Sequence, residues 1–185
     1  MRHPVTDLTL ASDEILAERS ADGDTVAFAV LVRRHGPYLR AFAARITGSS
    51  ADADDAVQEA LITAWDALSS LEDFSKVRAW LTSIVSRKST DRIRRRKPSS
   101  ELDEQRAEAD HRGPEARAIA SSQLDALADV LAALPEGQRQ CWVLKEVGGY
   151  SYDEIADELD ITPAVVRGRL ARARATVISE MEVWK

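Results

Sequence analysis

Four arginines with small residues between them lie near the end of the chain. They fall within a segment whose apolar residues have the spacing of one helix. An arginine guanidinium can donate two parallel hydrogen bonds to a guanine edge or a phosphate, and small neighbours let a helix approach the major groove. The segment therefore has the chemistry of a DNA-reading helix, although a solvated basic face on a core helix would have the same composition. The four residues are Arg167, Arg169, Arg172 and Arg174.

A second group of cations ends at Lys97. Residues 76–97 include nine lysines and arginines and one acidic residue, Asp91. Cations at the C-terminal end of a helix interact favourably with its dipole and cap its last carbonyls, which explains part of this group. The number of cations exceeds what capping needs, so a groove that binds a nucleic-acid backbone is the better explanation.

The segment before these cations is acidic. Residues 52–73 include seven carboxylates and no lysine or arginine. Helical spacing places Asp55, Glu59, Ile62 and Asp66 on one side, opposite an apolar side. An exposed isoleucine among carboxylates indicates a protein partner with a basic, partly apolar surface, although scattered surface isoleucines without a role are common. The residues of the apolar side are Val57, Leu61, Ala64, Trp65 and Leu68.

The overall charge at first argues against DNA binding. A net charge of −6 and a pI near 5.2 would repel a phosphate backbone if the charges were evenly spread. They are segregated instead, because another acidic stretch at 101–115 follows the basic one and the last helix is basic again. Alternating charge blocks indicate that different parts of the chain bind different partners.

Two capped helices would hold the C-terminal arginines in place. Ser151 and Glu154 have the spacing of a capping box, and Thr162 with Pro163 marks a second helix start. Only residues 159–161 remain for the turn, so the sequence predicts a helix-turn-helix. Helical spacing turns one set of the second helix inward, against Ile155, Ala156 and Leu159; the set is Val166, Leu170, Ala173 and Val177. The outward set is Arg167, Gly168, Ala171, Arg172 and Ala175.

High alanine, leucine, glutamate and arginine content with only 8 glycines predicts an all-α protein. The segment 97–114 has almost no apolar residues and is bracketed by prolines, which is typical of a linker. We therefore expect two small helical domains, 12–97 and 121–185, joined by an acidic flexible linker at 98–120. Each domain is near the lower size limit for an independent core.

The predicted N-terminal domain begins with a short helix from about Asp13 to Arg19 and a turn at 22–24. A long helix follows, which we expect to be bent or interrupted at Gly36 and Pro37 and to end at Gly48. Its apolar stripe is Phe28, Leu31, Val32, His35, Leu39, Phe42 and Ile46. In the next basic helix the residues expected to face inward are Trp80, Leu81, Ile84 and Val85.

The C-terminal domain is predicted to begin with an amphipathic helix that Pro135 ends. A helix at about 137–147 then leads through Gly148 and Gly149 into the helix-turn-helix. The apolar residues of the first of these helices are Leu124, Leu127, Val130, Leu131 and Leu134.

Several classes of function are disfavoured. One cysteine, Cys141, allows no internal disulfide and no thiolate metal cluster, and the three histidines lack metal-type spacing. No glycine-rich phosphate loop, signal peptide or membrane-length apolar run is present. No catalytic nucleophile can be assembled from the pattern. We therefore expect a cytoplasmic protein that is not an enzyme, uses no cofactor or metal and does not insert into a membrane.

Four segments in a fixed order carry a family resemblance. They are 52–65, 78–84, 133–136 and 150–156, which read DADDAVQEALITAW, RAWLTSI, ALPE and YSYDEIA. The chain resembles an extracytoplasmic-function (ECF) sigma factor, one of the small bacterial RNA polymerase sigma factors that keep only domains two and four. The resemblance covers about residues 13–177.

The resemblance implies three partners, which are core RNA polymerase, promoter DNA and an anti-sigma factor. The acidic helix would dock on the clamp coiled coil of the largest subunit, domain four on the flap of the second-largest, and the acidic linker would suit the RNA-exit channel. The implied core-binding residues are Asp55, Gln58, Glu59 and Ile62, with Trp65 on the same helix.

The resemblance also implies two DNA-binding sites. The loop at about 70–77 and the helix after it would open the minus-ten element and capture an unpaired base. The candidates there are Phe74, Ser75, Lys76, Arg87, Lys88, Asp91 and Arg94. The helix-turn-helix would read the minus-thirty-five element. Its candidates are Thr162, Arg167, Gly168, Ala171, Arg172 and Arg174.

Two residues depart from the family pattern. Arg87 stands where many relatives carry an asparagine, and Gly168 where they usually carry a serine, so base specificity at both sites stays open. The alternative function is a self-contained helix-turn-helix regulator, which would bind duplex DNA without polymerase, often at symmetric half-sites.

Overall fold

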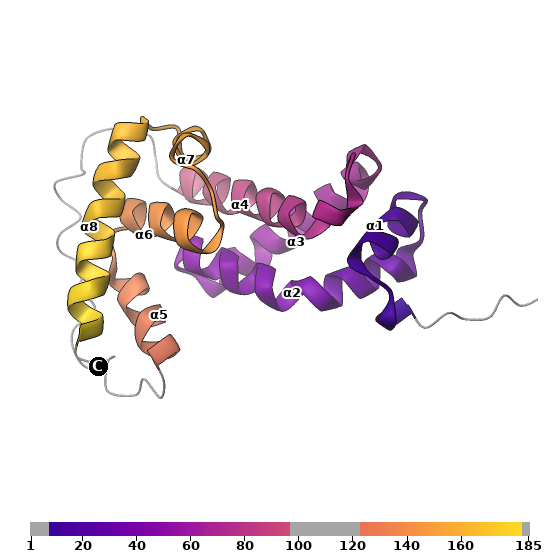
Figure 1. Ribbon diagram of the computed structural model, residues 1–185, viewed down its shortest axis with the longest axis horizontal. Coiled ribbons are helices and arrows are strands. Elements are labelled where there is room, and N and C mark those ends of the chain that lie inside the picture. Colours follow the sequence, from indigo (N-terminus) through magenta and orange to yellow (C-terminus); the bar gives the residue numbers. More distant parts are fainter. Residues whose placement is uncertain (1–7, 97–122, 183–185) are drawn as a thin grey trace, which may run out of the picture. The chain divides into compact units, whose positions relative to one another are not determined.

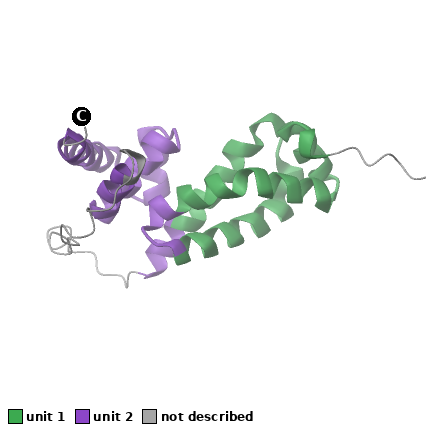
Figure 2. Ribbon diagram, turned by 90° about the horizontal axis from the view of Figure 1, so that it is seen from below, with its two compact units in different colours: residues 1–43, 51–89 green, residues 44–50, 90–185 purple. Residues whose placement is uncertain are grey.

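The computed structural model describes residues 8–96 and 123–182, and every regular element in these ranges is helical (Figure 1). The predicted all-α class is therefore confirmed. The chain divides into two compact units, residues 1–43 with 51–89 and residues 44–50 with 90–185 (Figure 2). The domain bounds expected from the sequence stay a prediction, and the linker expected at 98–120 lies outside the described residues.

The first helix and the turn after it form as the sequence predicts. A 3₁₀ turn, η1 (Leu8–Leu10), precedes α1 (Asp13–Ala21), whose N-cap hydroxyl on Ser12 accepts from the backbone N–H of Ile15 at 3.3 Å. Gly23 takes a φ of 90° in the turn. Asp24 then caps the next helix, because its Oδ1 accepts from the backbone N–H groups of Val26 and Ala27 at 2.9 and 3.1 Å.

The long helix α2 (Thr25–Thr47) runs without a break through Pro37, so it is not interrupted at Gly36 and Pro37, and the expected bend there stays a prediction. Pro37 lies on the exposed side, where water can satisfy the carbonyl that a proline leaves without a helical donor. Gly48 ends the helix at a φ of 69°, as predicted. The buried stripe includes the predicted Leu31, His35, Leu39, Phe42 and Ile46, whereas Phe28 and Val32 are half-buried.

Alanines form the buried side of α3 (Ser50–Ala67), so the expected apolar face is right only at Ala64 and at Leu68, which follows the helix. Ala53, Ala56 and Ala60 are buried with Ala64, while Val57, Leu61 and Trp65 are only half-buried at the edges. Small buried side chains let a neighbouring backbone approach closely. Trp65 meets the ring of Phe28 edge-on, with centroids 5.1 Å apart.

Two 3₁₀ turns, η2 (Leu68–Ser70) and η3 (Phe74–Lys76), connect α3 to α4 (Val77–Arg96). Leu81 and Val85 of α4 are buried as predicted, but Trp80 and Ile84 are half-buried. Hydroxyl residues take part of the inward side instead. The Ser89 hydroxyl donates to the carbonyl of Val85 at 2.8 Å, and this internal bond lets a polar side chain be buried there.

The C-terminal helices pack around α8. They are α5 (Gln123–Ala133), α6 (Glu136–Trp142), α7 (Tyr152–Leu159) and α8 (Pro163–Met181). α8 contacts each of the other three, as Figure 1 shows in orange and yellow. The cluster between α5 and α8 is built from Leu131, Leu134 and Ala173, with Leu127, Trp142 and Val177 at its edge.

One feature of this region departs from the predicted helix at 137–147. α6 changes after Trp142 into a π-helical turn, η5 (Val143–Val147). A π-helical turn widens the helix by one residue per turn and rotates the side chains that follow it. Gly149 then adopts a φ of 76° and redirects the chain toward α7.

Candidate nucleic-acid interface

The helix-turn-helix is capped as the sequence predicts. The backbone N–H of Ser151 donates to Glu154 Oε2 at 2.7 Å, and the N–H of Glu154 donates to the Ser151 hydroxyl at 3.2 Å. These bonds hold the pKa of Glu154 below its ordinary value. Thr162 caps α8 by accepting from the N–H of Val165 at 3.4 Å, and Pro163 is at the first helical position. Both helix starts are therefore fixed locally.

The turn between the helices depends on one residue that the pattern did not single out. Asp160 adopts a left-handed conformation, with φ 55° and ψ 50°, and ends α7. The chain then returns so that the N–H of Ile161 donates to the carbonyl of Ala156 at 3.0 Å. Aspartate tolerates this conformation better than most residues, which makes a turn without glycine feasible.

The inward and outward sides of α8 agree with their predicted assignment. Val166, Leu170 and Ala173 are buried, and Val177, the fourth residue of the predicted inward set, is half-buried. Outward, Thr162, Arg167, Ala171, Arg172 and Ala175 are exposed and Gly168 is half-exposed. Two guanidinium groups thus reach solvent on either side of a strip that carries only glycine and alanine, which is a surface that a DNA groove can approach.

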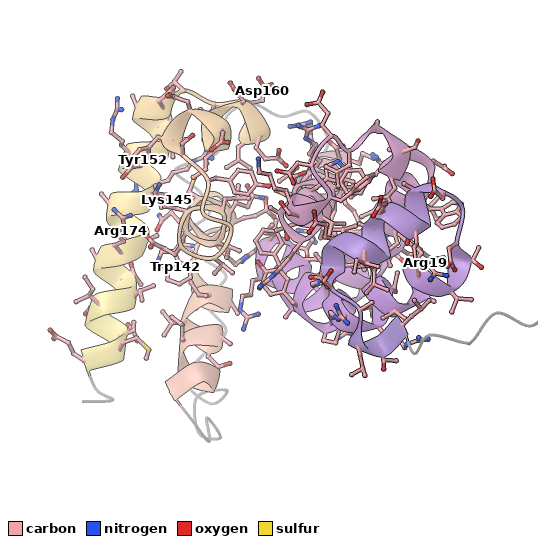
Figure 3. The ribbon with its side chains drawn as sticks, turned by 45° about the vertical axis from the view of Figure 1, so that its right-hand side comes forward. Arg19, Trp142, Lys145, Tyr152, Asp160 and Arg174 are labelled. Atoms are coloured by element: carbon pink, nitrogen blue, oxygen red, sulfur yellow. The ribbon has the colours of Figure 1, made fainter. Side chains whose placement is uncertain are left out.

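The other two arginines of α8 have neighbours within this unit. Arg169 lies against α6, because a Cβ at Gly137 would be 2.9 Å from its guanidinium carbon. Arg174 Nε and Nη2 donate to Glu146 Oε1 at 3.0 and 2.7 Å. Glu146 and Tyr152 both raise the pKa of Arg174, and Figure 3 shows Arg174, Lys145 and Tyr152 close together. The pattern did not single out Glu146, since its distance of 28 residues from Arg174 gives no local signal.

The first candidate residues for the minus-ten element lie in η3. Asp73 caps this turn, accepting from the backbone N–H of Ser75 at 3.1 Å and pairing with Lys76 Nζ at 3.0 Å. The hydrogen bonds from Ser75 and Lys76, that of the Ser75 hydroxyl first, lower the pKa of Asp73. Phe74 is half-buried beside the exposed Ser75 and Lys76. An ordered turn thus presents an aromatic side chain next to a cation.

The remaining candidates of this set follow along α4. Arg87 is exposed, Lys88 is half-buried, and both come before Asp91 on the same helix. Arg94 Nη1 donates to Asp91 Oδ1 at 3.1 Å, an i, i+3 pair on the helix surface. The cations of this helix therefore reach solvent over several turns, which suits contacts with a phosphate backbone.

The acidic side of α3 is partly organised by ion pairing. Arg40 of α2 pairs with Asp54, and this hydrogen bond lowers the pKa of that carboxyl group. Next to it, Asp55 and Gln58 are exposed, Glu59 is half-buried, and Ile62 is 60% exposed. The predicted combination of carboxylates and a solvent-facing isoleucine is therefore present on one helix side.

The described ranges hold no cluster of three or more histidine, cysteine, aspartate or glutamate residues that could bind a metal ion. Within the same ranges no helix combines the length and the apolar character needed to span a bilayer. Burial raises the pKa of the Cys141 thiol, with Arg169 acting in the opposite direction.

Comparisons with known proteins identify the family. Residues 31–98 match the model for sigma-70 region 2, and residues 124–177 match the model for sigma-70 region 4. The chain is 33% identical over 176 residues to the RNA polymerase sigma factor NccH of Alcaligenes xylosoxydans xylosoxydans, covering 92% of this chain and 95% of NccH. The chain belongs to the ECF subfamily of sigma-70 factors.

Further relatives are similar to this ECF sigma factor along most of their length. The ECF sigma-E factor of Escherichia coli is 32% identical over 182 residues, covering 92% of this chain and 95% of the relative. The structure of CnrH in complex with the cytosolic domain of CnrY superposes with a TM-score of 0.56 at 32% identity, covering 92% of this chain and 97% of CnrH. As an ECF sigma factor, the protein directs promoter-specific transcription initiation.

Proposed function

We propose that this ECF sigma factor recognises its promoters through two separate surfaces once core RNA polymerase holds both. The observation that supports this most strongly is the capped helix-turn-helix with Arg167 and Arg172 exposed, in a chain that also matches sigma-70 region 2. A net charge of −6 disfavours tight binding of the free protein to DNA. Specificity would then arise only in the holoenzyme.

The upstream surface is α8, which we propose reads the minus-thirty-five element. Thr162, Gly168 and Ala171 lie with the two arginines on its exposed side. The arginines would contact guanine edges or phosphates, while the small residues allow the backbone to approach the groove.

The downstream surface comprises η3 and α4, which we propose open the minus-ten element. Phe74 would stack on an extruded base, with Ser75 and Lys76 beside it. The cations of α4 would contact the strand backbone, with Asp91 on the same helix; they are Arg87, Lys88 and Arg94. Extruding a base costs a few kcal/mol, and these contacts would offset it.

The exposed side of α3 is the proposed site for the polymerase itself. Asp55, Gln58, Glu59 and Ile62 offer carboxylates around an apolar centre, which fits a basic, partly apolar partner such as the clamp coiled coil. The C-terminal region would dock on the flap. We assign no catalytic role to the chain, because a sigma factor acts by binding, and we place it in the cytoplasm with the polymerase.

An anti-sigma factor is a further proposed partner. CnrH, which is 32% identical to this chain in its solved complex, is bound there to the cytosolic domain of CnrY. A comparable inhibitor of this chain would control when it reaches the polymerase.

Run-off transcription with and without this chain tests the proposal. Core RNA polymerase should start specifically at a cognate promoter only when the chain is present, and a mobility-shift assay without polymerase should show weak binding. Tight binding of the free chain to symmetric half-sites, together with no effect on run-off transcription, would instead establish a self-contained regulator.

A further inference from the structure

The ion pair between Glu146 and Arg174 connects η5 to α8. Two nitrogens of the guanidinium, Nε and Nη2, donate to the same carboxylate oxygen, Oε1, at 3.0 and 2.7 Å. Two donors from one planar group fix the orientation of that group better than a single contact does. The pair therefore constrains how α8 is rotated against η5.

The residue before Glu146 fixes the other helix of the motif. Lys145 Nζ donates to the carbonyl of Tyr150 at 2.9 Å, directly before the capping box of α7, and lies 5.1 Å from the ring centre of Tyr152 (Figure 3). Tyr152 in turn contributes to the raised pKa of Arg174. One π-helical turn thus binds both helices of the helix-turn-helix through consecutive side chains.

The position of Arg174 along α8 argues against a role in base recognition. A recognition helix contacts base edges mainly with its N-terminal residues, and Arg174 is the twelfth residue of α8. At about 100° per residue, Arg174 lies about 20° around the helix axis from Arg167, on the side nearer the buried residues. It is also two turns further along α8. Its guanidinium is bound by Glu146, although 43% of the Arg174 side chain stays exposed.

We infer that Glu146 and Arg174 are positioning residues, which hold the recognition helix at the rotation where Arg167 and Arg172 face the DNA groove. This inference rests on the proposed reading of the minus-thirty-five element by α8. It differs from the sequence-based expectation that Arg174 contacts DNA itself. A direct contact and a positioning role predict opposite effects of removing Glu146.

If Arg174 bound a phosphate, Glu146 would compete for it and repel the DNA, so Glu146→Gln would strengthen binding. If the pair positions α8, Glu146→Gln and Arg174→Gln should each weaken binding by about threefold to tenfold, and the double variant should be little worse than either single one. The slope of the logarithm of the affinity against the logarithm of the salt concentration should also stay unchanged. Loss of a phosphate contact would instead reduce the size of this slope by about one.

The experiment measures affinity of the holoenzyme, formed with the full chain, for a promoter fragment that carries the minus-thirty-five element, over a range of salt. A fragment in which that element is scrambled measures any loss of affinity that does not depend on recognition of the element. Asp129→Asn is the matched control for removal of a carboxylate, because Asp129 is exposed on α5. Arg172→Gln is the control for a direct DNA contact, and it should lower the salt slope if that contact is to a phosphate.

Equal, non-additive losses confined to the intact element, with an unchanged slope, support the inference. Tighter or unchanged binding by Glu146→Gln, or a lower slope for Arg174→Gln, overturns it. If the single variants unfold, the exchanged pair Glu146→Arg with Arg174→Glu decides, since recovery of affinity supports positioning and no recovery overturns it. A holoenzyme of the unaltered chain that does not distinguish intact from scrambled DNA would overturn the proposed function instead.

Discussion

His35 Nε2 lies 2.8 Å from Asp13 Oδ2, which connects the first turn of α1 to the middle of α2. Arg34 donates to the other oxygen of the same carboxylate and also to the backbone carbonyls of Thr9 and Ala11, at 2.9 and 3.0 Å. One partly buried carboxylate thus accepts from two consecutive residues of α2. These polar contacts hold the start of α1 against α2.

Because of the Asp13 carboxylate, we expect the free energy of unfolding to fall as the pH is lowered. Burial acts to raise its pKa, but the hydrogen bonds and charges of Arg34 and His35 outweigh burial, so the pKa lies below the ordinary value of 3.8. Because the folded-state pKa is depressed, the stabilisation is complete above about pH 4 and is lost as the pH falls through the folded-state value. Asp13→Asn should cost about 1 kcal/mol at neutral pH and reduce the loss of stability on acidification.

Urea unfolding at neutral pH and at about pH 3 measures this effect. Glu14→Gln is the control, because Glu14 is an exposed carboxylate on the same turn of α1. Equal acid sensitivity of Asp13→Asn and the unaltered chain would contradict the prediction.

The core of the helix-turn-helix offers a stability prediction. Leu170 is 1% exposed, so Leu170→Ala should destabilise the C-terminal region by about 2–5 kcal/mol through lost burial and a cavity. Val165, on the same helix, is 37% exposed, and Val165→Ala should change the free energy of unfolding by less than about 0.5 kcal/mol. Thermal unfolding by circular dichroism compares the two, and similar melting temperatures would show that Leu170 is not part of the core.

We expect promoter recognition to depend on Arg167 and Arg172. Replacing either with alanine should weaken use of the minus-thirty-five element by about 1–3 kcal/mol if a bidentate guanine contact is lost. Run-off transcription from promoters with single base changes in that element measures the effect, because a base-reading arginine loses discrimination at one position only. Transcription that is indifferent to both substitutions would mean that another side of α8 faces the DNA.

The helix-turn-helix could be predicted from sequence because its signals are local. The bonds of the capping box join residues three apart, and the buried residues of α8 recur with helical spacing. Features that depend on distant contacts could not be predicted in this way. Pro37 continues a helix that proline normally ends, and the π-helical turn leaves no pattern in its five residues.

The site residues show the same division. The outward side of α8 follows from spacing alone, whereas the pairing of Arg174 with Glu146 depends on the fold. The alanine side of α3 could not be predicted from the apolar pattern, because alanine is small and nearly neutral in such patterns. Resemblance to the family supplied the roles of Phe74 and Asp55, which no spacing rule gives.

The exposed side of α3 predicts separable effects on polymerase binding and on folding. Asp55→Arg reverses a charge on the helix side that carries the exposed Ile62 and should weaken competition for core RNA polymerase while leaving the melting temperature unchanged within a few degrees. Glu59→Arg should act in the same direction. Glu72→Arg, an exposed acid outside this helix side, serves as the charge-matched control. If all three variants compete for core enzyme as well as the unaltered chain does, the surface lies elsewhere.

We expect the substitution Gly168→Ala to stabilise the helix and to weaken promoter use. A Cβ at this position would meet only Arg172 Nη1, at 3.7 Å, so alanine fits without strain. Gly168→Ala should therefore stabilise the protein by about 0.5–1 kcal/mol, because glycine costs more backbone entropy in a helix. If the α8 backbone approaches the groove at Gly168, the added methyl group should weaken binding to the minus-thirty-five element despite the more stable helix. A higher melting temperature with undiminished promoter binding would show that Gly168 does not lie at the point of closest approach, and the small side chain of Ala171 would then be the next to enlarge.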